Sequence, residues 1–211
     1  MSANQMRLDV RIDVFEKTNQ WAKPLLTLKP AELVEGVLLE FQELEYLSKV
    51  PADYYLVQGE DGVPLEEGVP LSQQVVPEVR LRLVEAERPL PRGGRRPPGA
   101  AYLRDLETGR VYKLHWLPAI IGRPDKSQPH NELIAVNLES YKMGLRVSRR
   151  HVQITELNGR YFVESMSRNP TVLKREGEDG VAVTEQKRPL QHGDIIQLAR
   201  SNIAFKFIVR S

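Results

Sequence analysis

The chain of 211 residues contains no cysteine, which excludes a disulfide framework and thiolate metal sites and fits a reducing compartment. It has no apolar stretch long enough to span a bilayer, and acids interrupt the apolar positions of its first 15 residues, so no signal peptide is expected. Aromatic residues make up only 7% of the chain and are not interleaved with basic ones as a base-stacking platform requires. We therefore expect a cytoplasmic protein with no membrane insertion and no specific nucleic-acid ligand.

Groups that most catalytic sites need are also missing. The sequence has no phosphate-cradling glycine loop with its lysine, no paired carboxylates in a recognisable context, and no serine arranged with a base. Its four histidines, at positions 115, 130, 151 and 192, show no metal-ligand spacing. These observations predict a protein without catalytic residues, metal or cofactor.

Charge is distributed unevenly along the chain. Residues 1–85 hold 8 Lys and Arg against 15 Asp and Glu, a net charge of −7, whereas residues 86–211 hold 22 against 13, a net charge of +9. A basic second half suits an anionic partner such as a phosphopeptide, a nucleic acid or a membrane surface. An ordinary solvated surface is an equally good interpretation of the charge alone.

Residues 86–100, with the sequence AERPLPRGGRRPPGA, separate the two halves. They contain four prolines, three glycines and four arginines but only one large aliphatic residue. So few apolar side chains cannot offset the entropy of ordering a backbone into a core. We predict a linker that its prolines partly stiffen.

Before the linker, the apolar pattern predicts an α+β domain over residues 1–85. A strand is indicated by the alternation from Leu8 to Val14, and Pro30 opens a helix with apolar residues at helical spacing. Further strands are expected at residues 25–28, 54–57 and 79–84. A sheet that wraps one amphipathic helix in this order is the β-grasp plan.

This half resembles ubiquitin-like domains over about residues 6–85. The resemblance rests on the run from Pro51 to Leu56, which glycine turns connect to Pro64-Leu65 and Leu71. It implies a β-grasp domain that docks other proteins. A free Gly-Gly end is missing, so the chemistry of a conjugated modifier is not expected.

After the linker, residues 101–211 read as β-structure throughout. Short apolar runs flank turn signals at Gly109, at Asn158-Gly159 and at residues 200–202. Many short strands with turns between them favour a β-sandwich. The fold class is therefore mixed, with an N-terminal α+β domain followed by an all-β domain.

Four short stretches at the ends of apolar runs carry the chemistry of this second half. They are Gly122-Arg123, Ser148-Arg149-Arg150-His151, Asn169-Pro170-Thr171 and the run from Leu190 to Asp194. Taken alone, Gly122-Arg123 is better explained as a turn with a solvated arginine. Together, a guanidinium fork, a hydroxyl and an amide at one rim suit a phosphate ester on an extended peptide.

The order and spacing of these stretches resemble the forkhead-associated (FHA) domain, a family that binds phosphothreonine peptides. The resemblance covers residues 101–211. It implies phosphate contacts from Arg123 and Ser148, a hold on the peptide backbone by Asn169, a second positive group at Arg149, and a contact from Arg146 to a ligand side chain. Arg168 and Lys174 are weaker candidates of the last kind.

The resemblance also implies structural support of the site by five residues, among which the imidazole braces the binding loops. They are Gly122, His151, Thr171, Gly193 and Asp194. One departure is Pro170, which stands where the family usually has glycine; proline fixes φ and removes an N–H next to Asn169. The stretch from Pro124 to Arg146 is also longer than usual, so residues 125–131 are expected to form an extended loop near the rim.

These inferences predict a two-domain adaptor. Its C-terminal domain would bind a phosphothreonine-containing protein, either a Ser/Thr kinase or a kinase substrate, and its ubiquitin-like domain would dock a second protein. Two alternatives stay open: a scaffold that binds without phosphate, and a nucleic-acid-associated protein that uses the basic linker and the basic C-terminal surface.

Overall fold

The computed structural model describes residues 6–127 and 129–210. It divides into two compact units between Glu87 and Arg88, and each unit is considered by itself. Within the described residues, none of the helices has the length and apolar character needed to cross a membrane.

The first unit is a five-stranded sheet with the strand order β2-β1-β5-β3-β4. Its strands are β1 (Val10–Val14), β2 (Lys17–Ala22), β3 (Tyr54–Gln58), β4 (Val63–Pro64) and β5 (Arg80–Glu85). The helices are α1 (Pro30–Glu40) and the short α2 (Leu71–Gln74), with a 3-10 turn, η2, at Pro51–Asp53. The sheet is mixed, because β1 and β5 run parallel at its centre whereas the other pairs are antiparallel.

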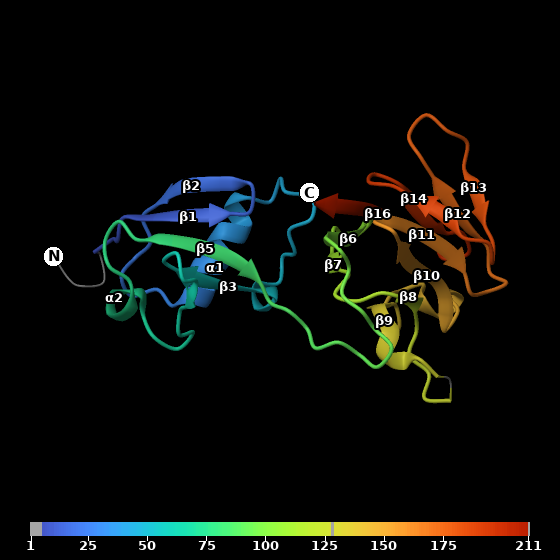
Figure 1. Ribbon diagram of the computed structural model, residues 1–211, viewed down its shortest axis with the longest axis horizontal. Helices are drawn as coiled ribbons and strands as arrows, with labels where there is room; N and C mark the ends of the chain where they lie inside the picture. The colour runs from blue at the N-terminus through green and yellow to red at the C-terminus, as the bar shows by residue number, and fades with distance from the viewer. Residues whose placement is uncertain (1–5, 128, 211) are drawn as a thin grey trace. The chain divides into compact units, whose positions relative to one another are not determined.

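Alternation along β1 explains how this unit folds. Val10, Ile12 and Val14 are buried, and the residues between them are partly exposed, so one face of the sheet is apolar. Helix α1 buries its own apolar stripe, including Leu33 and Val37, and lies against the sheet in Figure 1. The helix begins at Pro30 as predicted.

The second strand was predicted in the wrong place. Residues 25–28 form a bridge at Leu25 and a turn, whereas β2 is Lys17–Ala22. The misplaced strand has a physical reason. Because β2 is an edge strand and largely exposed, its sequence KTNQWA is polar and shows no apolar alternation.

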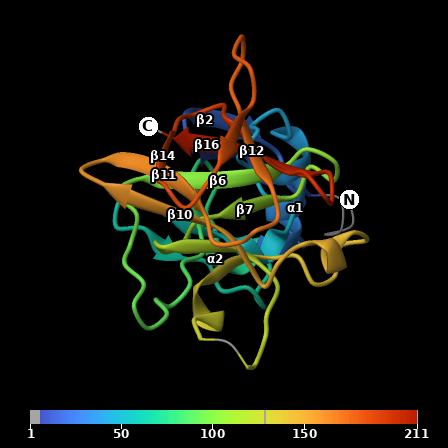
Figure 2. The same cartoon turned by 90° about the vertical axis from the view of Figure 1, so that its right-hand side faces the viewer.

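The second unit consists of two sheets packed face to face. One has the order β14-β11-β10-β8-β9 and the other the order β13-β12-β15-β16-β6-β7. Figure 2 shows both sheets of this unit. Their strands are β6 (Ala100–Asp105), β7 (Val111–Lys113), β8 (Ala119–Gly122), β9 (Ile134–Asn137), β10 (Arg150–Leu157), β11 (Arg160–Ser165), β12 (Thr171–Lys174), β13 (Val181–Val183), β14 (Arg188–Leu190), β15 (Ile195–Leu198) and β16 (Ile203–Arg210). Two 3-10 turns, η3 (Asn131–Leu133) and η4 (Gly144–Arg146), lie in the connections.

Both sheets contribute to one apolar core. Ile121 and Ile154 from the first sheet and Ile196 and Phe207 from the second are essentially inaccessible to solvent. The predicted hairpin at Asn158-Gly159 joins β10 to β11, and both of these residues have positive φ, as a type I′ turn requires. The all-β sandwich expected for this half is confirmed.

The first residues of the second unit make specific contacts with its sandwich. The backbone of Arg95 pairs with that of Leu117, and its guanidinium lies 2.6 Å from a carboxylate oxygen of Glu156. Arg96 donates to the backbone carbonyl of His115 at 3.1 Å. Part of the Pro/Gly/Arg-rich segment is therefore held to the sandwich. The division of the chain into a ubiquitin-like domain, a linker and an FHA-like domain stays a prediction.

Candidate functional site

Three strand ends meet at one edge of the sheet that contains β8, β10 and β11. Strand β10 is antiparallel to both of its neighbours, so its first residues lie beside the last residues of β8 and β11. Arg123 therefore follows β8, Ser148 precedes β10, and Asn169 follows β11, all at the same edge. The pairing of β10 with β8 and β11 thus brings Arg123 and Asn169, which are 46 positions apart in the sequence, to the same end of the sheet.

These side chains line an open cleft of about 440 Å³. Its lining consists of Arg123, Leu145, Val147, Ser148, Arg149, Arg150, Met166, Ser167 and Asn169. Three arginines, two hydroxyls and an amide face a few apolar groups, which is the composition of a site for an anion carried on a short apolar stem.

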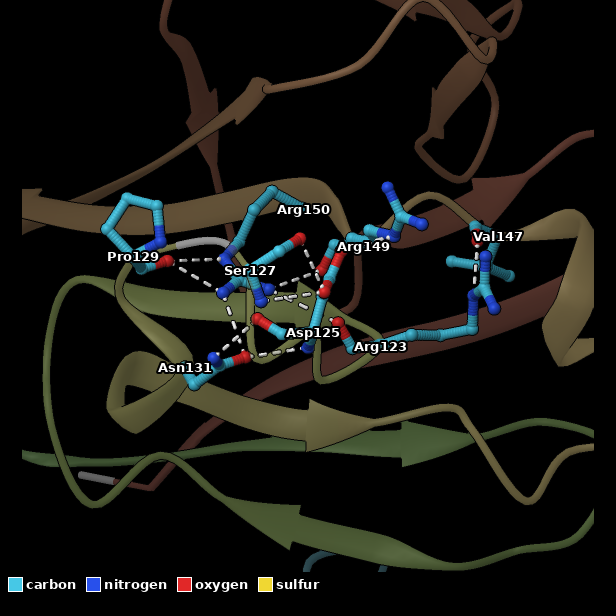
Figure 3. Close-up of polar contacts among 8 residues, drawn as sticks. All are labelled: Arg123, Asp125, Ser127, Pro129, Asn131, Val147, Arg149 and Arg150. Carbon is cyan, nitrogen blue, oxygen red and sulfur yellow. Dashed lines mark hydrogen bonds and ion pairs between the residues drawn. The ribbon is translucent and has the colours of Figure 1, made fainter.

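The Arg123 side chain is held by its own neighbourhood. Its Nε donates to the carbonyl of Val147 at 2.8 Å, and its backbone N–H donates to the carbonyl of Arg149 at 3.0 Å. The contact to Val147 is shown in Figure 3. Among the described residues, only the Nε of this guanidinium has a hydrogen-bond partner, so the two terminal nitrogens keep the fork geometry that binds phosphate.

A small polar cluster lies beside this arginine. The Ser148 hydroxyl is 2.5 Å from that of Ser167 and accepts a hydrogen bond from Asn169 Nδ2 at 2.9 Å. The Asn169 backbone N–H in turn donates to the Ser167 hydroxyl. Asn169 Oδ1 has no hydrogen bond with the described residues, so it is available to accept one from a ligand N–H. Asn169 lines the cleft although Pro170 follows it.

His151 lies beneath the cleft and is only 1% exposed. Its Nδ1 accepts a hydrogen bond from the backbone N–H of Ser148 at 3.1 Å, and its Nε2 is 3.1 Å from the hydroxyl of the buried Thr171. A backbone N–H can only donate, so the neutral ring carries its proton on Nε2 and donates it to Thr171. Burial lowers the pKa of His151 to about 4, which keeps the ring neutral near neutral pH.

Gly122 is required by a close approach of two backbones. A Cβ at this position would lie 2.2 Å from the carbonyl oxygen of Arg149, far inside van der Waals contact. Absence of a side chain therefore lets the end of β8 approach the residues that precede β10. Arg123 and Ser148 line one cleft because these two segments are so close.

The side chain of Arg149 is exposed and forms an ion pair with Asp125. Its Nε lies 2.6 Å from Asp125 Oδ2. Hydrogen bonds from the Ser127 backbone and hydroxyl, with a further contribution from the Arg149 charge, lower the pKa of Asp125. The carboxylate is therefore ionised, and its contact with Nε leaves the terminal nitrogens of Arg149 for a ligand.

Arg150 organises the long loop that follows Arg123. Its guanidinium donates to the carbonyl of Pro129 at 2.7 Å and to Asn131 Oδ1 at 3.0 Å, and it reaches the carbonyl of Arg123 at 3.2 Å. Figure 3 shows this side chain spanning the loop. Asn131 also exchanges two hydrogen bonds with the backbone of Asp125. The loop of residues 125–131 lies at the rim of the cleft, as expected. Residue 128 of this loop is outside the described residues.

Arg146 lies next to the cleft but does not line it. It borders a second hollow of about 480 Å³ together with Leu145, Asn169 and Arg200. Leu145 and Asn169 are shared with the cleft, so the two hollows adjoin. Arg200 belongs to the turn between β15 and β16.

Gly193 and Asp194 are not among the residues that line the cleft. Asp194 precedes β15 at the end where Ile195 pairs with Lys174, whereas Thr171 pairs with Leu198 at the other end. The buried Asp194 accepts two hydrogen bonds of 2.8 Å from Arg175. Gly193 has a φ of +91° in the adjoining turn. Among the described residues, the hydrogen bonds of Gly193 and Asp194 join them to Arg175, Gln191 and Phe207, and none joins them to the residues that line the cleft.

Four residues of this region were given no individual role from the sequence. They are Asp125, Arg150, Ser167 and Arg200. Arginines and hydroxyls are frequent on any surface, so their types gave no signal. A Ser two residues before Asn169 was the one available indication, because a hydroxyl there can bond the backbone of its own turn. Over the described part of the chain, no three His, Asp or Glu side chains gather closely enough to hold a metal ion.

The second unit is thus a β-sandwich with an open cleft, lined by three arginines, at one end. Residues 119–199 match the family model of the FHA domain, and this part of the chain is an FHA domain. FHA domains are phosphopeptide-binding modules. The resemblance inferred from the motif is confirmed for these residues. No curated protein matches the chain.

Several solved structures are similar to about half of the chain. The FHA domain of human APLF in complex with an XRCC1 bisphospho peptide is 21% identical, with 52% of this chain and 98% of that chain covered and a TM-score of 0.39. Mycobacterium tuberculosis EmbR in complex with a low affinity phosphopeptide is 25% identical, with 54% and 25% covered and a TM-score of 0.39. The FHA domain of an Arabidopsis thaliana hypothetical protein is 17% identical, with 55% and 90% covered and a TM-score of 0.40.

Proposed function

We propose that the second unit binds phosphothreonine-containing segments of other proteins in the cleft between Arg123, Ser148 and Asn169, without catalysing a reaction. One observation carries the proposal: a guanidinium fork, a hydroxyl and an amide with a free Oδ1 converge from three strand ends on one open cleft. The phosphate would lie between Arg123, Arg149 and the Ser148 hydroxyl. Asn169 Oδ1 would accept a backbone N–H of the ligand.

The apolar part of the lining supports threonine as the phosphorylated residue. Leu145, Val147 and Met166 border the same cleft as the arginines. A methyl group beside the phosphate ester would contact this surface, whereas phosphoserine would leave it in water. Phosphorylation adds about −1.5 to −2 charges, so a Ser/Thr kinase would create the ligand and a phosphatase would remove it.

The test is a calorimetric titration of one peptide in its phosphothreonine, phosphoserine and unmodified forms. Loss of a hydrogen bond to a charged group costs about 1.5–3 kcal/mol, and about 1.4 kcal/mol is tenfold in affinity. Arg123→Ala and Ser148→Ala should therefore each weaken the phosphothreonine peptide about tenfold or more. Replacement of the exposed Arg160 by Ala, at the far end of β11, is the matched control. His151→Ala should mainly lower the melting temperature, because it braces the loops.

Equal affinity for the phosphorylated and unmodified peptides would refute phosphate recognition and favour a phosphate-independent scaffold. Nucleic acid provides a second discrimination. Duplex DNA should bind only weakly and lose affinity steeply with salt, because such binding acts through counterion release. A sequence-selective DNA complex that persists at physiological salt would favour the nucleic-acid alternative. A cytoplasmic location stays a prediction.

We also propose that the first unit is a ubiquitin-like β-grasp domain that docks a second protein. Support comes from its mixed sheet, with β1 and β5 parallel at the centre and α1 on one face. An adaptor needs two independent surfaces. Backbone amide shifts of residues 6–87 should therefore keep their free values when a phosphothreonine peptide saturates the cleft. Shifts throughout that unit would instead mean that it folds back onto the site.

A further inference from the structure

The face of the first unit's sheet that α1 does not cover carries a cluster of charged and aromatic side chains. Residues that pair directly across neighbouring strands lie on the same face of a sheet. Arg11 of β1 pairs with Trp21 of β2 and with Arg80 of β5. Asp13 of β1 pairs with Arg82 of β5. The buried residues that alternate with Arg11 and Asp13 lie on the opposite face, where α1 is placed in Figure 1. These five side chains therefore share one surface, which we call the open face.

Trp21 is an aromatic residue that the fold leaves half in solvent. It is 48% exposed, whereas tryptophan is highly buried on average in folded proteins. The Arg11 guanidinium lies over its ring at 4.0 Å from the centroid, and the Lys23 ammonium, which is ion-paired with Asp9 at 3.1 Å, lies 5.8 Å from it. A cation–π contact orients the Arg11 side chain but supplies no counter-anion. The open face thus presents a preoriented guanidinium beside an apolar ring.

Two guanidinium groups of the open face have no acidic partner. Arg80 is ion-paired with Asp13 at 2.7 Å. Among the described residues, no hydrogen bond or ion pair joins the side chain of Arg11 or Arg82 to another residue. A hollow of about 480 Å³ lies beside them, and it is lined by Asp13, Gly59, Glu60, Arg80 and Arg82. Residues 1–85 carry a net charge of −7, so two unpaired cations on one face are a local exception.

The spacing of these groups suits a short peptide segment. Neighbouring strands lie about 4.7–4.9 Å apart, so the ring on β2 and the guanidinium groups on β5 are separated by about 10 Å. An extended peptide advances about 3.3–3.6 Å per residue, so about three residues span this distance. A ligand with an apolar side chain on Trp21 would place carboxylates a few positions away on Arg11 and Arg82. Guanidinium forks match carboxylates in a bidentate geometry.

We infer that the open face docks an acidic segment of a partner protein, in which an apolar side chain lies within about three residues of the carboxylates. This inference rests on the docking role proposed for the first unit and names the surface and the chemistry of the partner. A nucleic acid fits the open face less well. The net charge of −7 repels a continuous polyanion, and Arg11 occupies a face of the Trp21 ring on which a base would stack.

The experiment titrates the full chain with three pools of unphosphorylated ten-residue peptides. Each pool has one fixed Leu, and three positions near it are all Glu, all Gln or all Lys, with degenerate residues elsewhere. Ten-nucleotide oligothymidine is the polyanion arm. NMR follows the Trp21 indole N–H and the amides of β1 and β5, so binding elsewhere in the chain does not enter the measured affinity. The variant is Arg11→Gln/Arg82→Gln, and the matched control is Lys29→Gln/Lys49→Gln, which removes two exposed cations outside the sheet.

For the wild-type chain, we expect the Glu pool to move the Trp21 indole signal and to bind about threefold to tenfold more tightly than the Gln pool. Two exposed charge pairs together account for a difference of this size. The arginine variant should lose the preference for Glu, because its open face has no unpaired cation. The lysine control should keep it. Amide signals of the arginine variant that are distant from both substitutions should match the wild type, since neither side chain is buried.

Three outcomes would overturn the open face as the docking surface and leave the docking role of the first unit in place. They are equal affinity of the wild-type chain for the Glu and Gln pools, a preference for Glu that persists in the arginine variant, and signal changes confined to α1. Tighter binding of oligothymidine than of the Glu pool would replace the acidic partner by a nucleic acid. If none of the three pools moves a signal of residues 6–87, the docking role proposed for the first unit is itself wrong.

Discussion

The neutral state of His151 makes the stability of the second unit depend on pH in a defined direction. In the unfolded chain its pKa is the ordinary 6.5, whereas burial in the folded chain lowers it to about 4. The unfolded state therefore binds the proton more readily, and stability is lost as the pH falls from 6.5 towards 4. Linkage gives a loss of about 2 kcal/mol by pH 5 and about 3 kcal/mol by pH 4.

The same protonation should disturb the binding loops. The added proton would sit on Nδ1, which faces the backbone N–H of Ser148, so two donors would point at each other. Ser148 is the residue that we place on the phosphate. We therefore expect that, as the pH falls, the loop that carries Ser148 leaves its position on His151 before the sandwich unfolds.

The assay is urea unfolding followed by tryptophan fluorescence between pH 7.5 and pH 4. The chain has two tryptophans, Trp21 in the first unit and the buried Trp116 in the second. In a Trp21→Phe background the emission reports on the second unit alone. His151→Gln in that background is the control, because its side chain keeps a donor and an acceptor but does not titrate near pH 5.

The variant should be less stable than the parent at pH 7.5, and the difference should narrow by about 2 kcal/mol at pH 5. All other titrating groups cancel in this comparison. A difference that stays constant across the range would refute the assignment of the buried neutral imidazole. So would an NMR titration in which the His151 ring protonates with a midpoint above pH 6.

Three further predictions test the packing around the site and the boundary between the two units. Gly122→Ala should destabilise the second unit by about 1–3 kcal/mol and weaken phosphopeptide binding, because its methyl group would meet the Arg149 carbonyl oxygen; urea unfolding and calorimetry measure the two effects. Arg175→Met should lower the unfolding free energy, since it leaves the carboxylate of Asp194 buried without its cation. Brief trypsin treatment should cut first after Arg92, which is exposed and is not followed by proline; mass spectrometry identifies the fragments.

Each of the two substitutions has a matched control variant within the second unit. Gly99→Ala adds the same methyl group where no atom lies within 4 Å, so it should leave stability unchanged. Lys174→Met removes an exposed cation next to the ion pair and should cost less than about 0.5 kcal/mol. Equal losses in either pair of variants would contradict the reasoning. For the boundary, first cleavage after Arg95 would mean that its pairing with Leu117 is not maintained in solution.

Elements with strong local signals could be predicted from the amino-acid sequence. Pro30 set the start of α1, and Asn158-Gly159 set the hairpin between β10 and β11, because these residues constrain the backbone wherever they occur. The polar edge strand β2 was missed, since an edge strand that is largely exposed buries no apolar face and therefore shows no apolar alternation.

The same division holds for the site. Arg123, Ser148 and Asn169 were found because their spacing matches a family pattern, and the pairing of β8 and β11 with β10 brings them to one edge. Contacts between distant segments leave no such pattern. The hold of Asp125 on Arg149, and the approach of Arg200 to the hollow at Arg146, depend on how separate loops meet in space. These contacts become apparent in the folded protein, because the geometry of each loop follows from the packing of the strands that carry it.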